Sequence, residues 1–294
     1  MIMKQYRYVK SNAFTSGESL GNPAACIFTG HEILSPEQMQ AIAAEHKGFV
    51  MEVVFCSQSD VADCKLTYYS SECEVEFCGH GTIATMYTMV KETPELMAKP
   101  IITAETNRKG IIEVFNAIQK EDAVYITAPD PIEHPMNLSV AQIEDALSLP
   151  HDPIRKDLPI RIIDAGLRTL LVPIADLDTE ISVYSNEQSL KTFCLGNDID
   201  IILIFSKQTS DNEAFAHTRV FAPKFGYLED PATGSGNSAF ANYLLSEGLW
   251  NGEPITIEQG GNDRIFNSVK LKCLNDRVLF GGKATKKIEG EYYI

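Results

Sequence analysis

Two segments of the chain have the length of a helix and carry no formal charge. The first runs from Phe77 to Val90, where His80 is neutral, and the second runs from Pro231 to Ser246. A helix without a polar face must be buried on all sides, whereas a surface helix keeps a charged stripe. The pattern therefore predicts two central helices, each enclosed by strands.

Both segments open on the same glycine spacing, because Thr233-Gly234-Ser235-Gly236 matches Cys78-Gly79-His80-Gly81. Each half also has an S-x-E-Q start typical of a capping box, then an apolar strand, then an alternating strand. These features are Ser35, Phe49–Cys56 and Cys64–Ser70 in the first half, and Ser185, Ile199–Ser206 and His217–Ala222 in the second. Four matches in one order indicate two homologous halves, with a boundary among the prolines between Lys120 and Pro135.

Composition narrows the class of protein. The 294 residues are 44% hydrophobic and 22% charged, which is a globular composition long enough for two domains. A formal charge of −15 without clustered Lys and Arg argues against nucleic acid as a partner. The N-terminal segment lacks the apolar region of a signal peptide, and no apolar run reaches membrane-spanning length. We therefore expect a cytoplasmic protein that binds neither nucleic acid nor membrane.

The repeat has a geometric consequence for function. If two similar domains face each other, the two glycine-rich turns can converge on one cleft. Each turn would offer free backbone N–H groups and the positive end of a helix dipole. Such a cleft favours an anion, most simply the carboxylate or phosphate of a small molecule.

The two turns could also form one of three other kinds of site. Both turns fit a relaxed dinucleotide fingerprint, G-x-G-x-x-A, but neither directly follows an apolar strand. A metal site would combine Cys73, Cys78 and His80, with Cys64 nearby, at a spacing that matches no common zinc site. The seven cysteines form no C-x-x-C pair, so a disulfide framework is also not expected.

The third kind of site is a nucleophilic one. Cys78, at a helix start, could be a thiolate with a lowered pKa. A two-base racemase would need a second thiol at the mirrored position, where this chain has Thr233. A hydroxyl has too high a pKa to act as the opposing base. The two-thiol mechanism is therefore not expected here.

An acid or base must then come from another residue, and Glu52 is the best candidate. It lies in FVMEVVFC between apolar neighbours, where burial would raise its pKa toward neutrality. It could instead lie at a strand edge and point to water. Asp230 could be a carboxylate favoured by the helix dipole, and His80 could be a core imidazole or face the same cleft as Asp230.

At these residues the chain resembles the phenazine-biosynthesis PhzF-like family, which is related in fold to diaminopimelate epimerase and proline racemase. The similarity covers nearly the whole length, and the combination of CGH with EDPATGS is highly specific. The motifs that carry it are GNPAAC at 21–26, the Glu of VMEVVF, EVEFCGHGT at 74–82, DAGLRTLLVPI at 164–174, RVFAPKFGYLEDPATGSGNSA at 219–239 and VLFGGKA at 278–284.

The resemblance implies an α+β fold of two pseudo-symmetric diaminopimelate epimerase-like domains. Each would be a curled, mostly antiparallel sheet around a buried central helix, with the active-site cleft between them. The N-terminal domain would be 1–122, completed by the last strand at about 283–294, and the C-terminal domain would be 123–282. A homodimer without cofactor or metal is also implied.

The resemblance also implies residue roles. In the phenazine enzyme an active-site Glu moves a proton between carbons of trans-2,3-dihydro-3-hydroxyanthranilate, and Glu52 matches that residue. His80 and Asp230 would hold polar groups of the substrate or relay protons. The expected substrate-binding residues are Cys78, Gly79, Gly81, Gly234, Ser235 and Gly236.

The chain departs from the family pattern at three places. Met51 stands where Ser is usual, Glu76 stands where Pro is usual, and EQGGNDRIFNS at 258–268 lacks the usual Met-Gly-Arg-Pro run. These changes leave the proton-transfer residues in place, but the substrate can differ from that of the phenazine enzyme. The first hypothesis is a cofactor-independent isomerase acting on a small carboxylate. The alternatives are an amino-acid racemase or epimerase and a non-catalytic small-molecule-binding protein.

Overall fold

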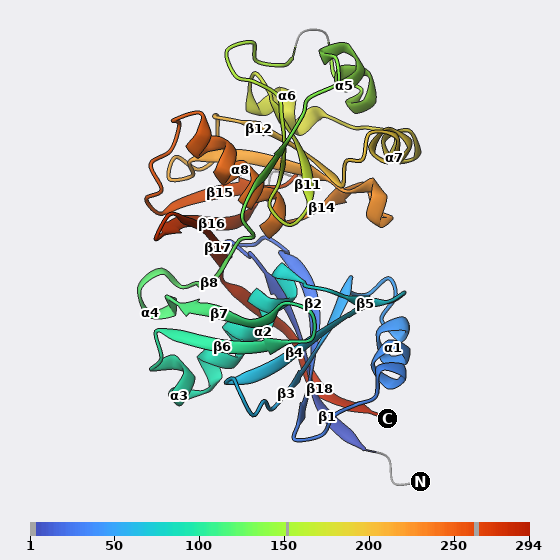
Figure 1. Cartoon of the computed structure of the whole chain (residues 1–294), viewed down its shortest axis with the longest axis vertical. Helices are drawn as coiled ribbons and strands as arrows, with labels where there is room; N and C mark the ends of the chain where they lie inside the picture. Colours follow the sequence, from blue (N-terminus) through green and yellow to red (C-terminus); the bar gives the residue numbers. More distant parts are fainter. Residues whose placement is uncertain (1–3, 151–152, 262–264) are drawn as a thin grey trace. The chain divides into compact units, whose positions relative to one another are not determined.

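The chain folds as two compact units. The computed structural model describes residues 4–150, 153–261 and 265–294. Unit 1 comprises residues 1–126 and 281–294, and unit 2 comprises residues 127–280. The chain leaves unit 1 after Ile126 and returns to it at Gly281, so the last strand belongs to the first unit (Figure 1).

Unit 1 is a curled, mostly antiparallel sheet around a helix (Figure 1). Its elements are β1 (Gln5–Ala13), β2 (Asn22–Gly30), α1 (Pro36–Glu45), β3 (Glu52–Ser57), β4 (Cys64–Ser70), β5 (Glu74–Val75), α2 (Gly79–Glu92), α3 (Pro94–Met97), β6 (Ile101–Thr106), β7 (Gly110–Asn116), α4 (Ile118–Glu121), β8 (Val124–Thr127) and β18 (Ala284–Tyr293). The strands pair in the order β18, β1, β2, β3, β4, β6, β7, β8, with β2–β3 and β4–β6 parallel. Helix α2 packs on β1, β2, β3 and β18, and α1 packs on β3 and β4.

Unit 2 repeats this plan. Its elements are β9 (Ile132–His134), α5 (Val140–Leu147), β10 (Arg161–Asp164), β11 (Arg168–Pro173), α6 (Leu177–Ser182), α7 (Glu187–Gly196), β12 (Ile201–Ser206), β13 (Ala216–Phe221), a 3-10 turn (Pro223–Phe225), β14 (Glu229–Asp230), α8 (Gly234–Ser246), β15 (Ile255–Gln259), β16 (Asn267–Leu274) and β17 (Arg277–Gly282). Helix α8 packs on β10, β11, β12 and β16.

The strand pairing confirms the internal duplication. In unit 1 the pairs β2–β3, β3–β4 and β4–β6 are parallel, antiparallel and parallel. In unit 2 the pairs β11–β12, β12–β13 and β13–β15 follow the same sequence of directions. The short strands β5 and β14 pair antiparallel with β4 and β13, just ahead of the central helices.

The two uncharged segments form buried central helices, as predicted. Every residue of α2 from Gly81 to Thr88 is buried, and most of α8 is buried in the same way. The hydroxyls of Thr82 and Thr88 in α2 donate to backbone carbonyls four residues earlier, at 2.7 Å to Cys78 and 2.8 Å to Ala84. None of the described helices is long and apolar enough to cross a membrane.

The two predicted capping boxes have different outcomes. Ser35 caps α1, and its side chain and that of Gln38 bond reciprocally to backbone N–H groups, as predicted. The capping box predicted at Ser185 is wrong, because Asn186 is the N-cap of α7 and accepts from the Ser189 N–H at 2.9 Å. Ser185 is instead buried and donates to the Leu147 carbonyl. The helix begins one residue later than the pattern suggested.

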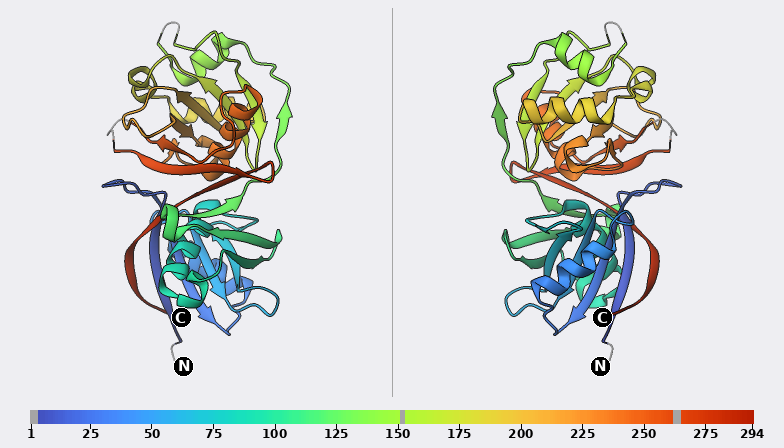
Figure 2. Two further views of the ribbon diagram at one scale, coloured as in Figure 1. Left: turned by 90° about the vertical axis from the view of Figure 1, so that its left-hand side faces the viewer. Right: turned by 90° about the vertical axis from the view of Figure 1, so that its right-hand side faces the viewer.

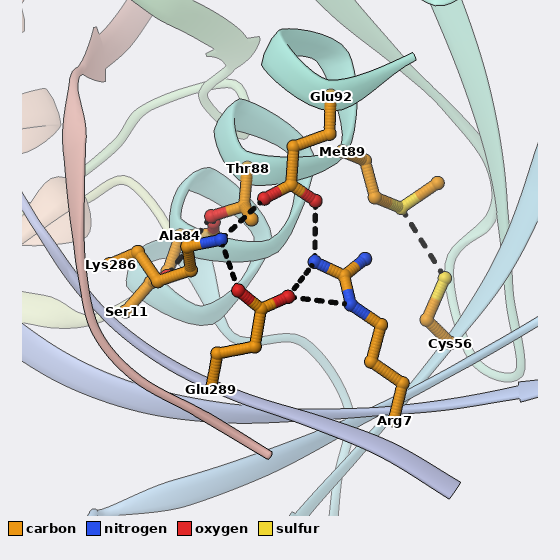
Figure 3. A network of polar contacts seen from close by, with 9 residues as sticks. All are labelled: Arg7, Ser11, Cys56, Ala84, Thr88, Met89, Glu92, Lys286 and Glu289. Atoms are coloured by element: carbon orange, nitrogen blue, oxygen red, sulfur yellow. Dashed lines mark hydrogen bonds and ion pairs between the residues drawn. The ribbon is translucent and has the colours of Figure 1, made fainter. Parts of the chain in front are cut away.

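A charged network joins the last strand to the rest of unit 1. Strand β18 pairs with β1 from Ala284 to Tyr293, beside it along its whole length (Figure 2). Arg7 of β1 and Lys286 of β18 each contact Glu92 at the end of α2 and Glu289 of β18 (Figure 3). All four side chains are 32–44% exposed, so solvent screens each pair.

Candidate active site

Strand β3 carries Glu52 at its first residue. Side chains alternate along a strand, so Glu52, Val54 and Cys56 share one face. That face is turned to α2, because Cys56 Sγ lies 3.4 Å from Sδ of Met89 on that helix. The opposite face packs in the apolar core beneath α1. Glu52 therefore lies at the end of the strand next to the start of α2, with its side chain 20% exposed.

The start of α2 is fixed by Cys78, its N-cap. Cys78 has an extended backbone, and its Sγ accepts a hydrogen bond from the Gly81 N–H at 3.3 Å. This is the position that Ser, Thr or Asp usually occupies, because the first N–H groups of a helix lack partners within it. Gly81 permits the packing here, since a Cβ would lie 2.9 Å from Cys78 Sγ and from Val54 Cγ2. The thiol is thereby held against the first turn.

Three chemically active side chains meet at this point. Nε2 of His80 lies 3.2 Å from Oε2 of Glu52. Sγ of Cys78 lies 3.6 Å from Nδ1 of His80 and 3.8 Å from Nε2. The ligand atoms of all three residues lie within 4.8 Å of one another. Glu52 therefore faces His80 rather than pointing freely to water. The catalytic roles of Glu52 and His80 stay a prediction.

The local charges favour an imidazolium. Burial works against a protonated His80, but the adjacent Cys78 sulfur and Glu52 carboxylate outweigh it and raise the pKa of His80 well above its usual value. Burial raises the pKa of the Cys78 thiol, although His80 and the Gly81 N–H act in the opposite direction. The charge of His80 therefore depends on both of its neighbours, Cys78 Sγ and the Glu52 carboxylate.

In unit 2, Asp230 and Thr233 form the corresponding turn. Asp230 ends β14 and is 9% exposed, and Thr233 is the extended N-cap of α8. Oγ1 of Thr233 donates to Oδ2 of Asp230 at 2.5 Å. Gly234, Ser235 and Gly236 form the first turn of α8, where Ser235 is partly exposed and both glycines are buried.

Gln259 is a residue of this turn that the sequence did not reveal. Its Oε1 accepts from the Thr233 N–H at 2.9 Å and from Asn237 Nδ2 at 2.7 Å. Its Nε2 donates to the Asp230 carbonyl at 2.9 Å and contacts Thr233 Oγ1 at 3.1 Å. The buried carboxamide therefore closes the turn between Asp230 and Asn237. The only signal in the sequence was its place at the end of an apolar strand, before two glycines.

Some of the predicted site residues lie close together in the structure. Within unit 1 it brings together Glu52, Cys78 and His80, with Gly79 and Gly81 in the same turn. It does not gather the alternative metal set, because Cys73 is exposed beside Ser70 and Cys64 is buried against Met86. The dinucleotide alternative also lacks its context, since the turn follows β5, a two-residue strand antiparallel to β4.

Comparison with known families decides the relationship. The family model PhzC-PhzF, described as phenazine biosynthesis-like protein, matches residues 11–290. The chain belongs to the PhzC-PhzF family. The family assignment predicted from the CGH and EDPATGS motifs is confirmed.

Two bacterial proteins show the similarity of this chain in sequence and in fold. An uncharacterized isomerase of Bacillus subtilis, YfhB, is 28% identical over 261 residues, covering 88% of this chain and 87% of that protein. The crystal structure of a PhzF family protein from Bacillus anthracis has a TM-score of 0.86 at 25% identity, covering 99% of this chain and 100% of the other.

More distant structures share only the fold. A hydroxyproline epimerase from Agrobacterium vitis matches with a TM-score of 0.62 at 13% identity, covering 100% of this chain and 92% of the other. The predicted fold, two similar halves of the diaminopimelate epimerase-like type, is therefore confirmed. At this identity the likeness carries no activity to this chain.

Proposed function

We propose that this PhzC-PhzF family member is a cofactor-independent isomerase that moves a proton on a small, carboxylate-bearing molecule, with Glu52 as the acid and base. The observation that carries the proposal is the 3.2 Å contact between Glu52 Oε2 and His80 Nε2. The relatives named as isomerases support the reaction class.

The proposed roles follow from the chemistry of each group. Glu52 removes a proton from a substrate carbon and returns it to another, because a carboxylate can both accept and donate. His80 positions the carboxylate through the 3.2 Å contact between its Nε2 and Oε2 of Glu52. Cys78, Gly79 and Gly81 form the substrate-binding turn at the start of α2, where the first backbone N–H groups lack partners within the helix and that of Gly81 donates to Cys78 Sγ.

The proposal also assigns roles to residues of unit 2. Asp230 would bind a polar group of the substrate or relay a proton. Gly234, Ser235 and Gly236 would bind its carboxylate through backbone N–H groups and a hydroxyl. A homodimer is also part of the proposal.

The alternative activity, a two-thiol racemase, conflicts with the residue at the start of α8. A racemase that uses two opposed thiols would need a second Cys at the start of α8. Thr233 stands there, and its hydroxyl donates to Asp230. A hydroxyl engaged in this way is not an acid or base near neutral pH. The one-base isomerase is therefore the better proposal, and a racemase would need a different second base.

Deuterium exchange tests the proposal directly. Wild type and Glu52→Gln are incubated in D2O with trans-2,3-dihydro-3-hydroxyanthranilate and a panel of small amino acids, and NMR detects deuterium at carbon. We expect one compound to exchange with wild type and at least about a hundredfold more slowly with Glu52→Gln, because general acid–base catalysis contributes about 10²–10⁴-fold.

The matched control is Glu72→Gln, since Glu72 is exposed and pairs only weakly with Lys47 at the surface. It should exchange at the wild-type rate. Equal exchange by wild type and Glu52→Gln would refute the role of Glu52. Exchange in none of the compounds would favour the non-catalytic binding protein.

A further inference from the structure

The Glu52, Cys78 and His80 cluster has the composition of a zinc site. It supplies one carboxylate oxygen, one sulfur and one imidazole nitrogen from two rigid elements, β3 and α2. Among the residues that the structure describes, this is the group of His, Cys, Asp and Glu side chains whose ligand atoms converge closely enough to hold a metal. The cluster therefore brings to one point the three ligand types that Zn²⁺ uses most.

Two of the three separations between the ligand atoms are close to those of a tetrahedral zinc site. Zinc bonds are about 2.3 Å to sulfur and about 2.0–2.2 Å to nitrogen and oxygen, so tetrahedral ligands are separated by roughly 3.4–3.6 Å. The cluster has 3.2 Å between Glu52 Oε2 and His80 Nε2, and 3.8 Å between His80 Nε2 and Cys78 Sγ. Both edges lie within a few tenths of an ångström of the required value. The third separation, between Glu52 Oε2 and Cys78 Sγ, is at most 4.8 Å, so a bound metal would draw these two ligands closer together.

Two further features point to a cation at this place. Oε2 of Glu52 is shielded from solvent, and its close polar neighbour is His80 Nε2, itself a possible metal ligand, at 3.2 Å. The Gly81 N–H bonds Cys78 Sγ, which orients the sulfur as an outer-shell donor orients a metal-bound thiolate. A sulfur and nitrogen donor set selects a borderline-soft ion over Mg²⁺ or Ca²⁺, which prefer oxygen ligands.

We propose that Zn²⁺ binds to Glu52 Oε2, Cys78 Sγ and His80 Nε2 as a reversible inhibitor. On binding, the Cys78 thiol and the protonated His80 each give one proton to the buffer, which frees Sγ and Nε2 as ligands, and water takes the fourth position. Zinc then occupies lone pairs of Glu52 and His80, which are no longer available for proton transfer. The binding stands independently of the proposed function, whereas the inhibition rests on it.

Cobalt and zinc binding test the proposal without a substrate. Tag-free wild type, Cys78→Ser and Glu52→Gln are titrated with Co²⁺ and followed by absorption, and with Zn²⁺ by calorimetry. Wild type should bind one equivalent of each metal and show a thiolate-to-cobalt charge-transfer band in the near ultraviolet. Cys78→Ser should lose the band, and each variant should bind Zn²⁺ at least about tenfold more weakly, because changes in outer-shell partners alone cost about 10–100-fold.

The matched control is Cys73→Ser, which removes an exposed cysteine outside the cluster and should leave the band and the affinity unchanged. A wild-type protein without a thiolate band would overturn the proposal even if a variant failed to fold. Zinc affinity equal in wild type and Cys78→Ser would do so as well, because the metal would then be bound elsewhere. If a substrate is found, exchange that continues with zinc bound would overturn the inhibition alone.

Discussion

Gly234 is required by the ring of Phe280 rather than by its own backbone conformation. A Cβ at Gly234 would lie 2.2 Å from Cε2 of that ring and 2.5 Å from Cδ2. The sequence predicted Gly234 as part of an anion-binding turn, and that role stays a prediction. Its packing role could not be derived from sequence, because nothing in the pattern brings Phe280 of β17 to the first turn of α8.

Gly234→Ala should therefore destabilise unit 2 by about 1–3 kcal/mol, the usual result of overpacking a core. Chemical denaturation measures the loss, and Gly234→Ala/Phe280→Leu should recover part of it by making room for the methyl group. The matched control is Gly196→Ala in α7, where a Cβ meets no atom. It should stabilise by about 0.4–1 kcal/mol. Equal stability of Gly234→Ala and wild type would refute the packing argument.

The residues of the candidate site were predictable to different degrees. Glu52 stood out in the sequence because a carboxylate among apolar strand residues is unusual. Its contact with His80 could not be predicted, since sequence alone gives no distance between β3 and α2. Gln259 was missed altogether, because a single Gln at a strand end resembles any polar residue there. What distinguishes it is the set of partners around its carboxamide.

At the scale of elements, Arg219 connects α6, β13 and β14. Its Nη1 donates to the carbonyls of Glu180, Ile181 and Val183 at the end of α6, where the last carbonyls of a helix need partners from outside it. The Glu180 carbonyl also accepts from the Val183 N–H at 3.3 Å. Its Nε and Nη2 form a two-pronged pair with Glu229, at 2.9 and 2.8 Å. Glu229 precedes Asp230, so the same buried guanidinium also fixes the approach to the turn.

Arg219→Leu should lower the free energy of unfolding by about 3–5 kcal/mol, because it leaves Glu229 without its guanidinium and removes three hydrogen bonds to carbonyls at the end of α6. Arg219→Lys should recover little of this, since one ammonium cannot reach both groups as the planar guanidinium does. Urea denaturation followed by circular dichroism measures both variants. A lysine variant as stable as wild type would show that charge alone, rather than the fork of donors, holds these elements.

Element boundaries were predictable where the physical signal was strong. The central helices were identified because a charge-free helical segment has only one stable environment, the interior. The start of α7 was misplaced because Ser185 and Asn186 can both cap a helix, and only the packing of Ser185 against Leu147 decides between them. The two-residue strands β5 and β14 show no periodicity, so no pattern could reveal them.

At the scale of the molecule, each unit has a core of its own. One core in unit 1 packs β-strand side chains against α1, and one in unit 2 packs them against α5 and α7. The last strand, β18, contributes to unit 1 although it follows all of unit 2 in the sequence. The predicted domain limits, 1–122 with about 283–294 and 123–282, stay a prediction, as does the homodimer.

Removal of residues 284–294 should destabilise unit 1 selectively. The deletion takes away the partner of β1 over its whole length and exposes that strand as an open edge. It also leaves Arg7 and Glu92 without Lys286 and Glu289 (Figure 3). Hydrogen exchange with mass spectrometry should show protection in β1 and α2 falling by more than about tenfold, with β11 to β13 nearly unchanged, because stability is distributed locally.

The full-length variant Glu289→Gln separates strand pairing from charge. It breaks the network but keeps every backbone hydrogen bond of β18, and half-exposed ion pairs contribute at most about 1 kcal/mol. It should therefore change exchange in β1 only slightly. If Glu289→Gln loosened β1 as much as the deletion did, the charges rather than the strand would hold unit 1 together. If the deletion loosened β1 and β12 equally, the two units would share one unfolding event and their cores would not be independent.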